Sequence, residues 1–298
     1  MANAVFTFSE SSVYDDRPEI RYHFPKAYLR RVEQTKGDWV VYYEPRRTSG
    51  PSSVSGRLAY FAMAMVDRIE PDHRLQDHYY AYITPSSYLE FDNPVPFRDG
   101  ARYFEPALSK SDGSTNKGAF GHAVRTISRA EFEAILGAGF TRRRDEWEGM
   151  DARVAEPAAE YVVHPRVEQI LSRPFRDAAF RRHVRRAYSN TCAVTGLRLL
   201  NGGGRPEVQA AHIRPVEHDG PDSVRNGLAL TATVHWLFDR GLLSLDDSYN
   251  ILLSPHGVSE DIARLIPSDR RLFCKPENPQ DMPHPAYLAW HRENVFKG

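Results

Sequence analysis

The chain has few cysteines, no long apolar run and no excess of charge of one sign, and each shortage excludes a class of protein. Cys192 and Cys274 are its only cysteines among 298 residues, so no disulfide framework can form. This predicts a reducing, cytoplasmic setting. No apolar run approaches the ~20 residues of a membrane-spanning helix. The stretch 1–10 lacks a basic n-region and an apolar h-region, so we expect no secretory signal there.

What remains is the composition of a soluble globular protein long enough for two domains. Hydrophobic residues make up 41% and charged residues 26% of the chain. Basic and acidic residues number 39 each, so the net charge of +0 does not by itself indicate a nucleic-acid partner. Local patterns along the chain are more informative.

The first ~140 residues are typical of a β-rich domain. Short apolar runs predict strands at 38–43, 58–66 and 78–83. Segments rich in Ser, Pro and Gly predict turns at 47–56 and 93–100. Ser128 and Glu131 have capping-box spacing, which predicts a helix over 128–136. Strands at this spacing with few helices favour a small barrel or sandwich.

The second half has a different pattern. We expect a linker at 146–165 between domains at 1–145 and 166–298, because 141–157 is charged and turn-prone. Helices are predicted at 175–188 and 231–240, and strands at 207–215 and 226–230. A hairpin is predicted for 242–245 and 249–253. The predicted fold class is therefore α+β.

A basic run precedes this second pattern. Between 173 and 186 one acid, Asp177, faces six arginines. A basic helix is often only a solvated face, but this one leads directly into the segment discussed next, which favours contact with phosphates. The residues predicted to contact a DNA backbone are Arg181, Arg182, Arg185, Arg186 and, further on, Arg214.

Three polar features follow in order along 192–245. His212 lies in an apolar strand, Asn226 opens the next strand as Asn-Gly-Leu, and His235 with Asp239 lies on the following helix. The i, i+4 spacing puts His235 and Asp239 on one helix face. Each feature alone has an ordinary explanation as a core, turn or surface residue. Their combination is suited to phosphodiester hydrolysis, which needs a base to take a proton from water and a cation to stabilise the phosphate charge.

The same segment resembles the HNH (ββα-metal) endonuclease family over roughly residues 165 to 255. The resemblance rests on Ala187-Tyr188 through Gly196, and on the motifs at 210–215 (AAHIRP), 226–230 (NGLAL) and 235–244 (HWLFDRGLLS). It implies that His212 is the general base, Asn226 the orienting asparagine, and His235 and Asp239 the ligands of a divalent metal, Mg²⁺ or Mn²⁺.

The chain departs from the family pattern at two positions. Many relatives carry a further ligand directly before the base, where this chain has Ala211, so the third metal ligand stays open, Gln209 being one candidate. Many relatives also hold a structural zinc with two CxxC pairs. Here Thr195 stands where the cysteine after Cys192 would be, so we predict no zinc knuckle.

The front half resembles, on fewer residues, the PUA-like superfamily of small β-barrels, which includes EVE and SRA readers of modified cytosine. The resemblance rests on the Phe-Pro-Lys entry at 24–26 and the Gly-Asp-Trp-Val-Val-Tyr-Tyr run at 37–43. Most of its many aromatic residues must form the core. The residues predicted to line a modified-base pocket are Trp39, Tyr42, Tyr43, Tyr22 and His23.

Together the two resemblances imply a modification-dependent DNA restriction endonuclease that cuts double-stranded DNA near 5-methyl- or 5-hydroxymethylcytosine. Two alternatives stay open: an HNH nuclease or nickase that ignores base modification, and an inactive DNA reader, which the missing ligand at Ala211 would favour. One HNH site cuts one strand, so a double-strand break requires a homodimer or two successive visits. The base modification read, the cleavage offset and the cation are not determined by the sequence.

Overall fold

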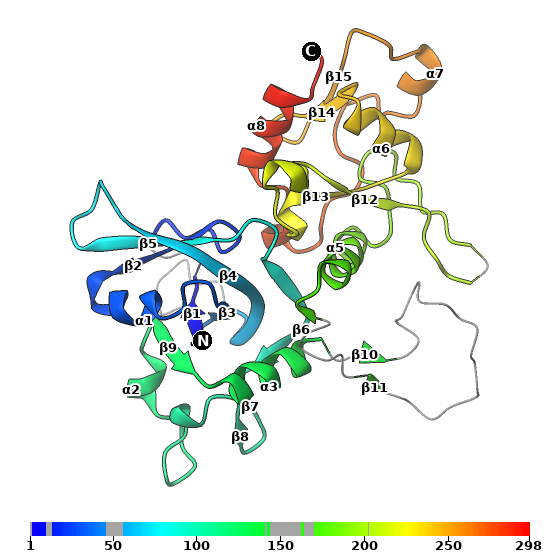
Figure 1. The fold of residues 1–298 in the computed structure, drawn as a ribbon. Coiled ribbons are helices and arrows are strands. Elements are labelled where there is room, and N and C mark those ends of the chain that lie inside the picture. The colour runs from blue at the N-terminus through cyan, green and yellow to red at the C-terminus, as the bar shows by residue number, and fades with distance from the viewer. Residues whose placement is uncertain are drawn as a thin grey trace. The chain divides into compact units, whose positions relative to one another are not determined.

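The computed structural model describes residues 2–9, 14–45, 56–140, 142–143, 162–163, 170–201 and 203–298. The chain divides into two compact units, Met1–Ser172 and Arg173–Gly298 (Figure 1). The predicted linker at 146–165 lies outside the described residues except for 162–163. Within the described parts, no helix combines the length and apolarity that crossing a bilayer requires.

The N-terminal unit is built on one mixed sheet of seven strands. The strand order is β2-β5-β4-β3-β1-β9, and β6 pairs with β4 off this path. β1 and β3 run parallel, and the other pairs are antiparallel. The strands are β1 (Asn3–Thr7), β2 (Arg21–Pro25), β3 (Trp39–Glu44), β4 (Ala59–Pro71), β5 (His78–Ile83), β6 (Leu89–Pro96) and β9 (Val124–Ile127).

The long strand β4 gives this sheet its curvature. Its first half pairs with β3 and its second half with β5, and register shifts interrupt both ladders. Such irregularities increase twist and bend the strand, which appears as a long curved ribbon in Figure 1. The strand path ends on β2 and β9, and among the described strands nothing pairs these two. The α+β class is therefore confirmed, a closed barrel is not observed among the described strands, and the PUA-like assignment stays a prediction.

The N-terminal unit also contains short helices and hairpins. Helix α3 begins at the predicted capping box, in which Ser128 Oγ accepts from Glu131 N and the Glu131 carboxylate accepts from Ser128 N. The elements are η1 (Lys26–Tyr28), α1 (Leu29–Glu33), β7 (Arg98–Asp99), β8 (Arg102–Tyr103), η2 (Pro106–Leu108), α2 (Lys117–Phe120), α3 (Arg129–Gly139), β10 (Arg142–Arg143) and β11 (Val162–Val163).

One sequence expectation in this unit was wrong. The turn predicted at 93–100 is partly strand, because β6 continues through Asn93 to Pro96. Among the described strands β6 pairs with β4 alone, so it is an edge strand. An edge strand tolerates the two prolines of this stretch. The predicted strand at 78–83 is confirmed as β5, and the strand predicted at 58–66 extends to Pro71.

A buried ion pair crosses the unit beside its aromatic core. The Arg125 guanidinium donates to both Glu105 oxygens at 2.8 and 2.9 Å, and the Tyr60 hydroxyl donates to the same carboxylate at 2.6 Å. All three side chains are buried. A bidentate pair that is fully hydrogen-bonded offsets its desolvation cost, whereas removing one partner would leave a buried charge uncompensated.

The C-terminal unit places a helix directly after a two-stranded ribbon. β12 (Gln209–His212) pairs antiparallel with β13 (Gly227–Leu230), so that His212 lies opposite Gly227, and α6 (Ala232–Asp239) follows. Helix α5 (Arg173–Ala187) packs on both strands. This ββα unit carries every residue that the sequence predicted for the base, the asparagine and the metal.

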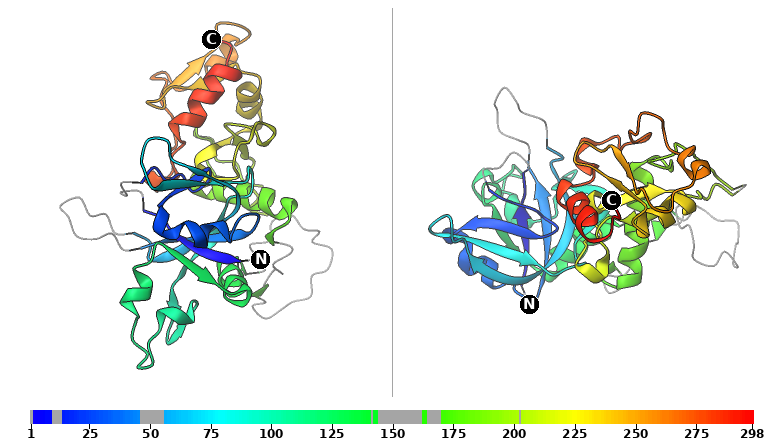
Figure 2. Two further views of the ribbon diagram at one scale, coloured as in Figure 1. Left: turned by 60° about the vertical axis from the view of Figure 1, so that its left-hand side comes forward. Right: turned by 90° about the horizontal axis from the view of Figure 1, so that it is seen from above.

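A second small ribbon completes the unit. The predicted hairpin is confirmed as β14 (Leu243–Leu245) and β15 (Ile251–Leu253), and α8 (Pro285–Asn294) packs against β14 (Figure 2). The strand predicted at 207–215 is shorter in the structure. The remaining short elements are η4 (Val216–His218), η5 (Val224–Asn226), α7 (Glu260–Ala263) and η6 (Pro279–Asp281).

Candidate active site

His212 ends strand β12 and is held from two directions. Its ring stacks on Phe180 of α5 with 3.8 Å between centroids and an interplanar angle of 11°. Its Nε2 lies 3.0 Å from Oδ1 of Asp222, a side chain that is almost fully buried. The His212 side chain itself keeps 24% of its surface exposed. The imidazole is thus fixed in orientation while one edge stays accessible.

Asn226 is buried and ties the loop between β12 and β13 together. Its Oδ1 accepts from Arg214 N, and its Nδ2 donates to the carbonyls of Arg214 and Pro221, each at 2.9 Å. Its carbonyl accepts from Ile213 N at 2.9 Å. These bonds fix the backbone directly after His212, which is the geometry that an orienting asparagine would have.

His235 and Asp239 lie one turn apart on α6, as their spacing predicted. The distance from His235 Nε2 to Asp239 Oδ2 is 3.4 Å. The other ring nitrogen, Nδ1, lies 2.8 Å from Gln209 Oε1 on β12. A donor N–H at Nδ1 leaves the Nε2 lone pair directed toward Asp239, the arrangement that outer hydrogen bonds impose on metal-binding histidines.

Gln209 therefore has a different place from the one the sequence suggested. Its amide oxygen lies 2.8 Å from His235 Nδ1 instead of lying free to bind a cation, so Gln209 orients the His235 ring. Within the described parts of the chain, no group of three or more His, Cys, Asp or Glu side chains could together hold a metal ion. A cation here would have His235 and Asp239 as protein ligands and would complete its shell with water and phosphate.

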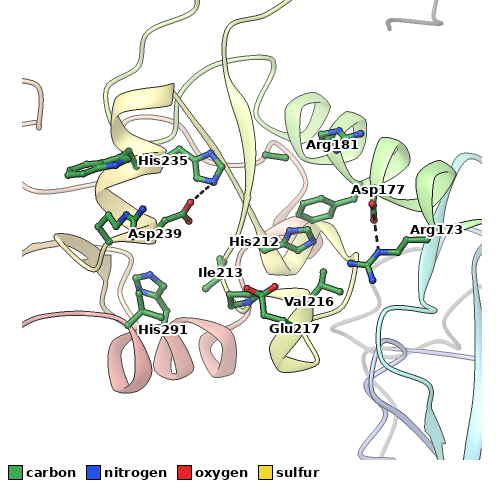
Figure 3. A pocket seen from close by; sticks show the side chains of 16 residues that line it. Arg173, Asp177, Arg181, His212, Ile213, Val216, Glu217, His235, Asp239 and His291 are labelled. Atoms are coloured by element: carbon green, nitrogen blue, oxygen red, sulfur yellow. Dashed lines mark ion pairs between the residues drawn. The ribbon is translucent and has the colours of Figure 1, made fainter. Parts of the chain in front are cut away.

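These groups share one pocket with a volume of about 570 Å³ (Figure 3). His235 and Asp239 enter it from α6, His212 from β12, and Arg173, Asp177 and Arg181 from α5. The pocket therefore brings the predicted base and the predicted metal ligands to one surface. Its other lining residues include Phe180, Glu217, Trp236, Arg240 and His291.

The predicted phosphate-binding arginines do not all reach this pocket. Arg181 lines it, together with Arg173, which belongs to the predicted basic run but not to the five residues predicted to contact DNA. Arg182, Arg185 and Arg186 are not among the residues that line it. Arg214 lines a neighbouring pocket of about 400 Å³, where its guanidinium lies 5.7 Å from the ring centre of Trp290. Their contact with DNA stays a prediction.

Two site residues were not found from the sequence. In the sequence, Phe180 is one apolar residue within a basic predicted helix. Asp222 lies in a Gly-Pro-Asp-Ser run that is typical of a turn. Neither position has a local pattern that indicates a contact with His212. The contacts arise because α5 packs on the ββα unit and because Asn226 folds the loop back.

The five residues predicted for a modified-base pocket do not line a common surface. Neighbours in a strand point to opposite faces of a sheet, and the predicted set contains the adjacent pairs Tyr22 and His23 on β2 and Tyr42 and Tyr43 on β3. Tyr22 and Tyr42 belong to the hydrophobic core, where Tyr22 stacks on Phe6.

The remaining members of the set lie elsewhere. Tyr43 is buried, in ring contact with Tyr60 and Phe120. His23 is buried too and stacks on Tyr80, with 4.5 Å between centroids. Trp39, at the start of β3, is half-buried. The prediction that all five residues line one pocket was therefore wrong, because it ignored the alternation of side chains along a strand.

A different polar group lies beside Tyr22 and Tyr42. Burial raises the pKa of Asp16 to about 7, although its Oδ1 accepts from His23 N at 2.6 Å. Burial and then the charge of Asp16 raise the pKa of Tyr42. The buried Tyr42 hydroxyl has no hydrogen-bond partner among the residues described. Asp16 is a carboxyl group poised to titrate near neutral pH, next to an unsatisfied hydroxyl.

Comparison with known proteins bears on the C-terminal unit. Residues 192–246 match the family described as HNH endonuclease. No protein of curated function matches the chain. Among solved structures, the chain is similar to one described as a modification dependent TagI restriction endonuclease, with 15% identity and a TM-score of 0.33, over 98% of this chain and 81% of that one.

The matched residues contain His212, Asn226, His235 and Asp239, the residues that the ββα geometry gathers around one pocket and its supporting loop. Family and geometry agree on the same segment. Residues 192–246 of this chain therefore belong to an HNH endonuclease domain.

Proposed function

We propose that this protein hydrolyses DNA phosphodiesters with His212 as general base and with a divalent cation held by His235 and Asp239. The observation that carries the proposal is that these three side chains line one pocket. A neutral imidazole suits proton transfer at physiological pH. The partly exposed edge of His212 gives water access to the ring. Asn226 would act indirectly, by holding the backbone that follows the base.

The chemistry of the donor set fits a divalent cation. His235 offers Nε2 because Gln209 occupies Nδ1, and Asp239 offers a carboxylate that is 56% exposed. One imidazole and one carboxylate leave several positions for water and phosphate oxygens, as in sites that bind Mg²⁺ or Mn²⁺. When bound, the cation would stabilise the charge that grows on the phosphate and on the departing 3′ oxygen.

The walls of the pocket suit a polyanion. Arg173 and Arg181 of α5 and Arg240 beside α6 line it and are exposed. Of these, Arg173 lies 3.9 Å from Asp177, a weak pair at an exposed site. Guanidinium groups bind phosphate oxygens with directed hydrogen bonds. We infer that these arginines hold the DNA backbone while His212 faces the scissile phosphate.

We further propose that the N-terminal unit makes cleavage depend on modified cytosine, and that Asp16 takes part in reading it. The Watson–Crick edge of cytosine places an acceptor, N3, beside a donor, the N4 amino group. A carboxyl group whose pKa is about 7 can donate from its protonated oxygen and accept at the other. These features support reading of a base removed from the duplex.

One assay tests both parts of the proposal. Matched plasmids carrying unmodified, 5-methyl- or 5-hydroxymethylcytosine are incubated with the full chain and Mg²⁺, Mn²⁺ or EDTA. We expect cleavage of modified plasmid that EDTA abolishes. His212→Ala should reduce the rate at least about 100-fold, because general base catalysis is worth that much. Asp16→Ala, which offers neither the donor nor the acceptor, should remove the preference for modified plasmid and leave cutting dependent on the cation.

A matched control is His256→Ala, since His256 is exposed and lies outside the pocket; it should cut like the parent. Equal cutting of modified and unmodified plasmid would remove the targeting part and leave a nuclease or nickase. Metal-independent binding with no cutting by the parent chain would instead indicate an inactive reader.

A further inference from the structure

Asp222 is a buried carboxylate that the chemistry proposed so far does not use. It is 1% exposed, and its Oδ1 lies 3.0 Å from His212 Nε2. The nearby Arg176 guanidinium, whose pKa burial lowers, is partly compensated by the charge of Asp222. A buried carboxylate of this kind needs a donor, and the His212 ring supplies one.

The loop fixes Asp222 from both sides through Asn226. Asn226 Nδ2 donates to the carbonyl of Pro221, and Asn226 N donates to the carbonyl of Ser223, each at 2.9 Å. Because the residues directly before and after Asp222 are both bonded to Asn226, Pro221 through the side-chain amide and Ser223 through the backbone N–H, the Asp222 carboxylate has little freedom to leave His212. The Phe180 ring stacks on the face of the imidazole and restricts its rotation.

The chemical consequence concerns the two nitrogens of His212. A neutral imidazole carries one N–H and one lone pair. If the hydrogen lies on Nε2 to serve Asp222, the lone pair must lie on Nδ1. Among the described residues, Nδ1 of His212 has no hydrogen-bond partner. The ring therefore has its basic nitrogen available and its donor nitrogen engaged.

We propose that Asp222 is a positioning residue that fixes His212 in the Nε2–H tautomer, so that Nδ1 is the atom that takes the proton from the attacking water. This inference rests on the proposed role of His212 as the base. In the step, an O–H bond of water breaks and its proton moves to Nδ1. The water oxygen bonds to phosphorus, the bond to the 3′ oxygen breaks, and that oxygen takes a proton from solvent. Asp222 stabilises the imidazolium that results.

The competing explanation is that Asp222 only anchors its loop. A structural anchor would affect stability and leave the tautomer undetermined. The two explanations therefore differ in a spectroscopic property of the parent protein, which can be measured without any substitution at Asp222.

The first experiment is nitrogen NMR of the full chain with ¹⁵N-labelled histidine, with the His212 signals assigned by their loss in His212→Ala. We expect the neutral ring to be the Nε2–H tautomer in the parent. In Asp222→Asn the signals should move toward Nδ1–H or a mixture, because an amide can donate to Nε2. An Nδ1–H ring or an even mixture in the parent overturns the proposal, whether or not the protein cuts DNA.

The second experiment is kinetic. Asp222→Asn should lower kcat by about 10² to 10⁴ and leave KM within about threefold, because the group acts on the base and not on DNA binding. Asp261→Asn makes the same change at an exposed side chain outside the pocket and should leave both constants unchanged. A folded Asp222→Asn protein with parental kcat overturns the proposal. Failure of the parent to cut DNA would instead sink the proposed function, while the tautomer still decides the role of Asp222.

Discussion

His291 shows how one buried side chain makes the stability of the C-terminal unit depend on pH. It is 2% exposed, stacks on Phe238 at 3.8 Å, accepts from Ser244 at Nδ1 and donates to the Phe238 carbonyl from Nε2. Burial lowers its pKa from 6.5 to about 4. The neutral ring satisfies both neighbours, so protonation has no favourable site to occupy.

The direction of the effect follows from proton binding. Between pH 6.5 and 4 the unfolded chain binds the proton and the folded chain does not, so stability is lost as the pH falls. Between pH 7 and pH 5 this costs about 2 kcal/mol. Glutamine at this position keeps a donor for the Phe238 carbonyl but does not titrate. We therefore expect the free energy of unfolding of His291→Gln, measured by urea denaturation, to fall by about 2 kcal/mol less than that of the parent between pH 7 and pH 5. Equal losses in both proteins would show that other groups cause the acid sensitivity.

At the scale of elements, the Asn-Gly pair that opens β13 allows α5 to pack closely. A Cβ at Gly227 would lie 2.3 Å from Val184 Cγ2 and 3.2 Å from the Phe180 ring. Val184 is fully buried and β-branched, so it cannot move its methyl group away. The glycine is needed for close approach and not for an unusual backbone angle, since its φ is −129°.

Gly227→Ala should therefore destabilise the protein by about 1–3 kcal/mol through overpacking. It should also lower kcat, because Phe180 supports the His212 ring and would be displaced. Thermal unfolding and plasmid cleavage measure the two effects, and adding Val184→Ala should restore part of both. Gly137→Ala is the control, since a Cβ there meets nothing within 4 Å and alanine favours a helix. Parental stability in Gly227→Ala would show that α5 is not packed this closely.

The same scale explains which elements the sequence could predict. Strand β5 and helices α3 and α6 follow from apolar periodicity and from caps such as Ser128 with Glu131, which are local signals. The ion pair of Arg125 with Glu105 and the contact of Asp222 with His212 join elements through tertiary packing, for which single-sequence patterns hold no information. The residues proposed as base and metal ligands could be singled out from the sequence because the ββα unit keeps them within a short segment.

At the scale of the whole molecule, the number of nuclease sites in one copy decides whether the proposed reaction gives nicked or linear DNA. The described part of the chain holds one pocket with His212, His235 and Asp239, so one copy that acts as proposed would break one strand in one encounter. Double-strand breaks then need a second event or a second copy. We expect supercoiled plasmid to become nicked circles first, with linear DNA following later from those circles.

A time course at several protein concentrations separates the two routes. If single copies act in succession, the nicked intermediate accumulates and its conversion to linear DNA is first order in protein. If linear DNA instead forms without a nicked intermediate, and its rate rises with the square of the protein concentration, two copies must act together. That result would place the second active site in a partner chain and contradict the expectation of single copies acting in turn. The control mixes the parent and the inactive His212→Ala protein in known ratios with Mg²⁺. If two copies act together, the inactive copy should lower the rate at which the parent forms linear DNA.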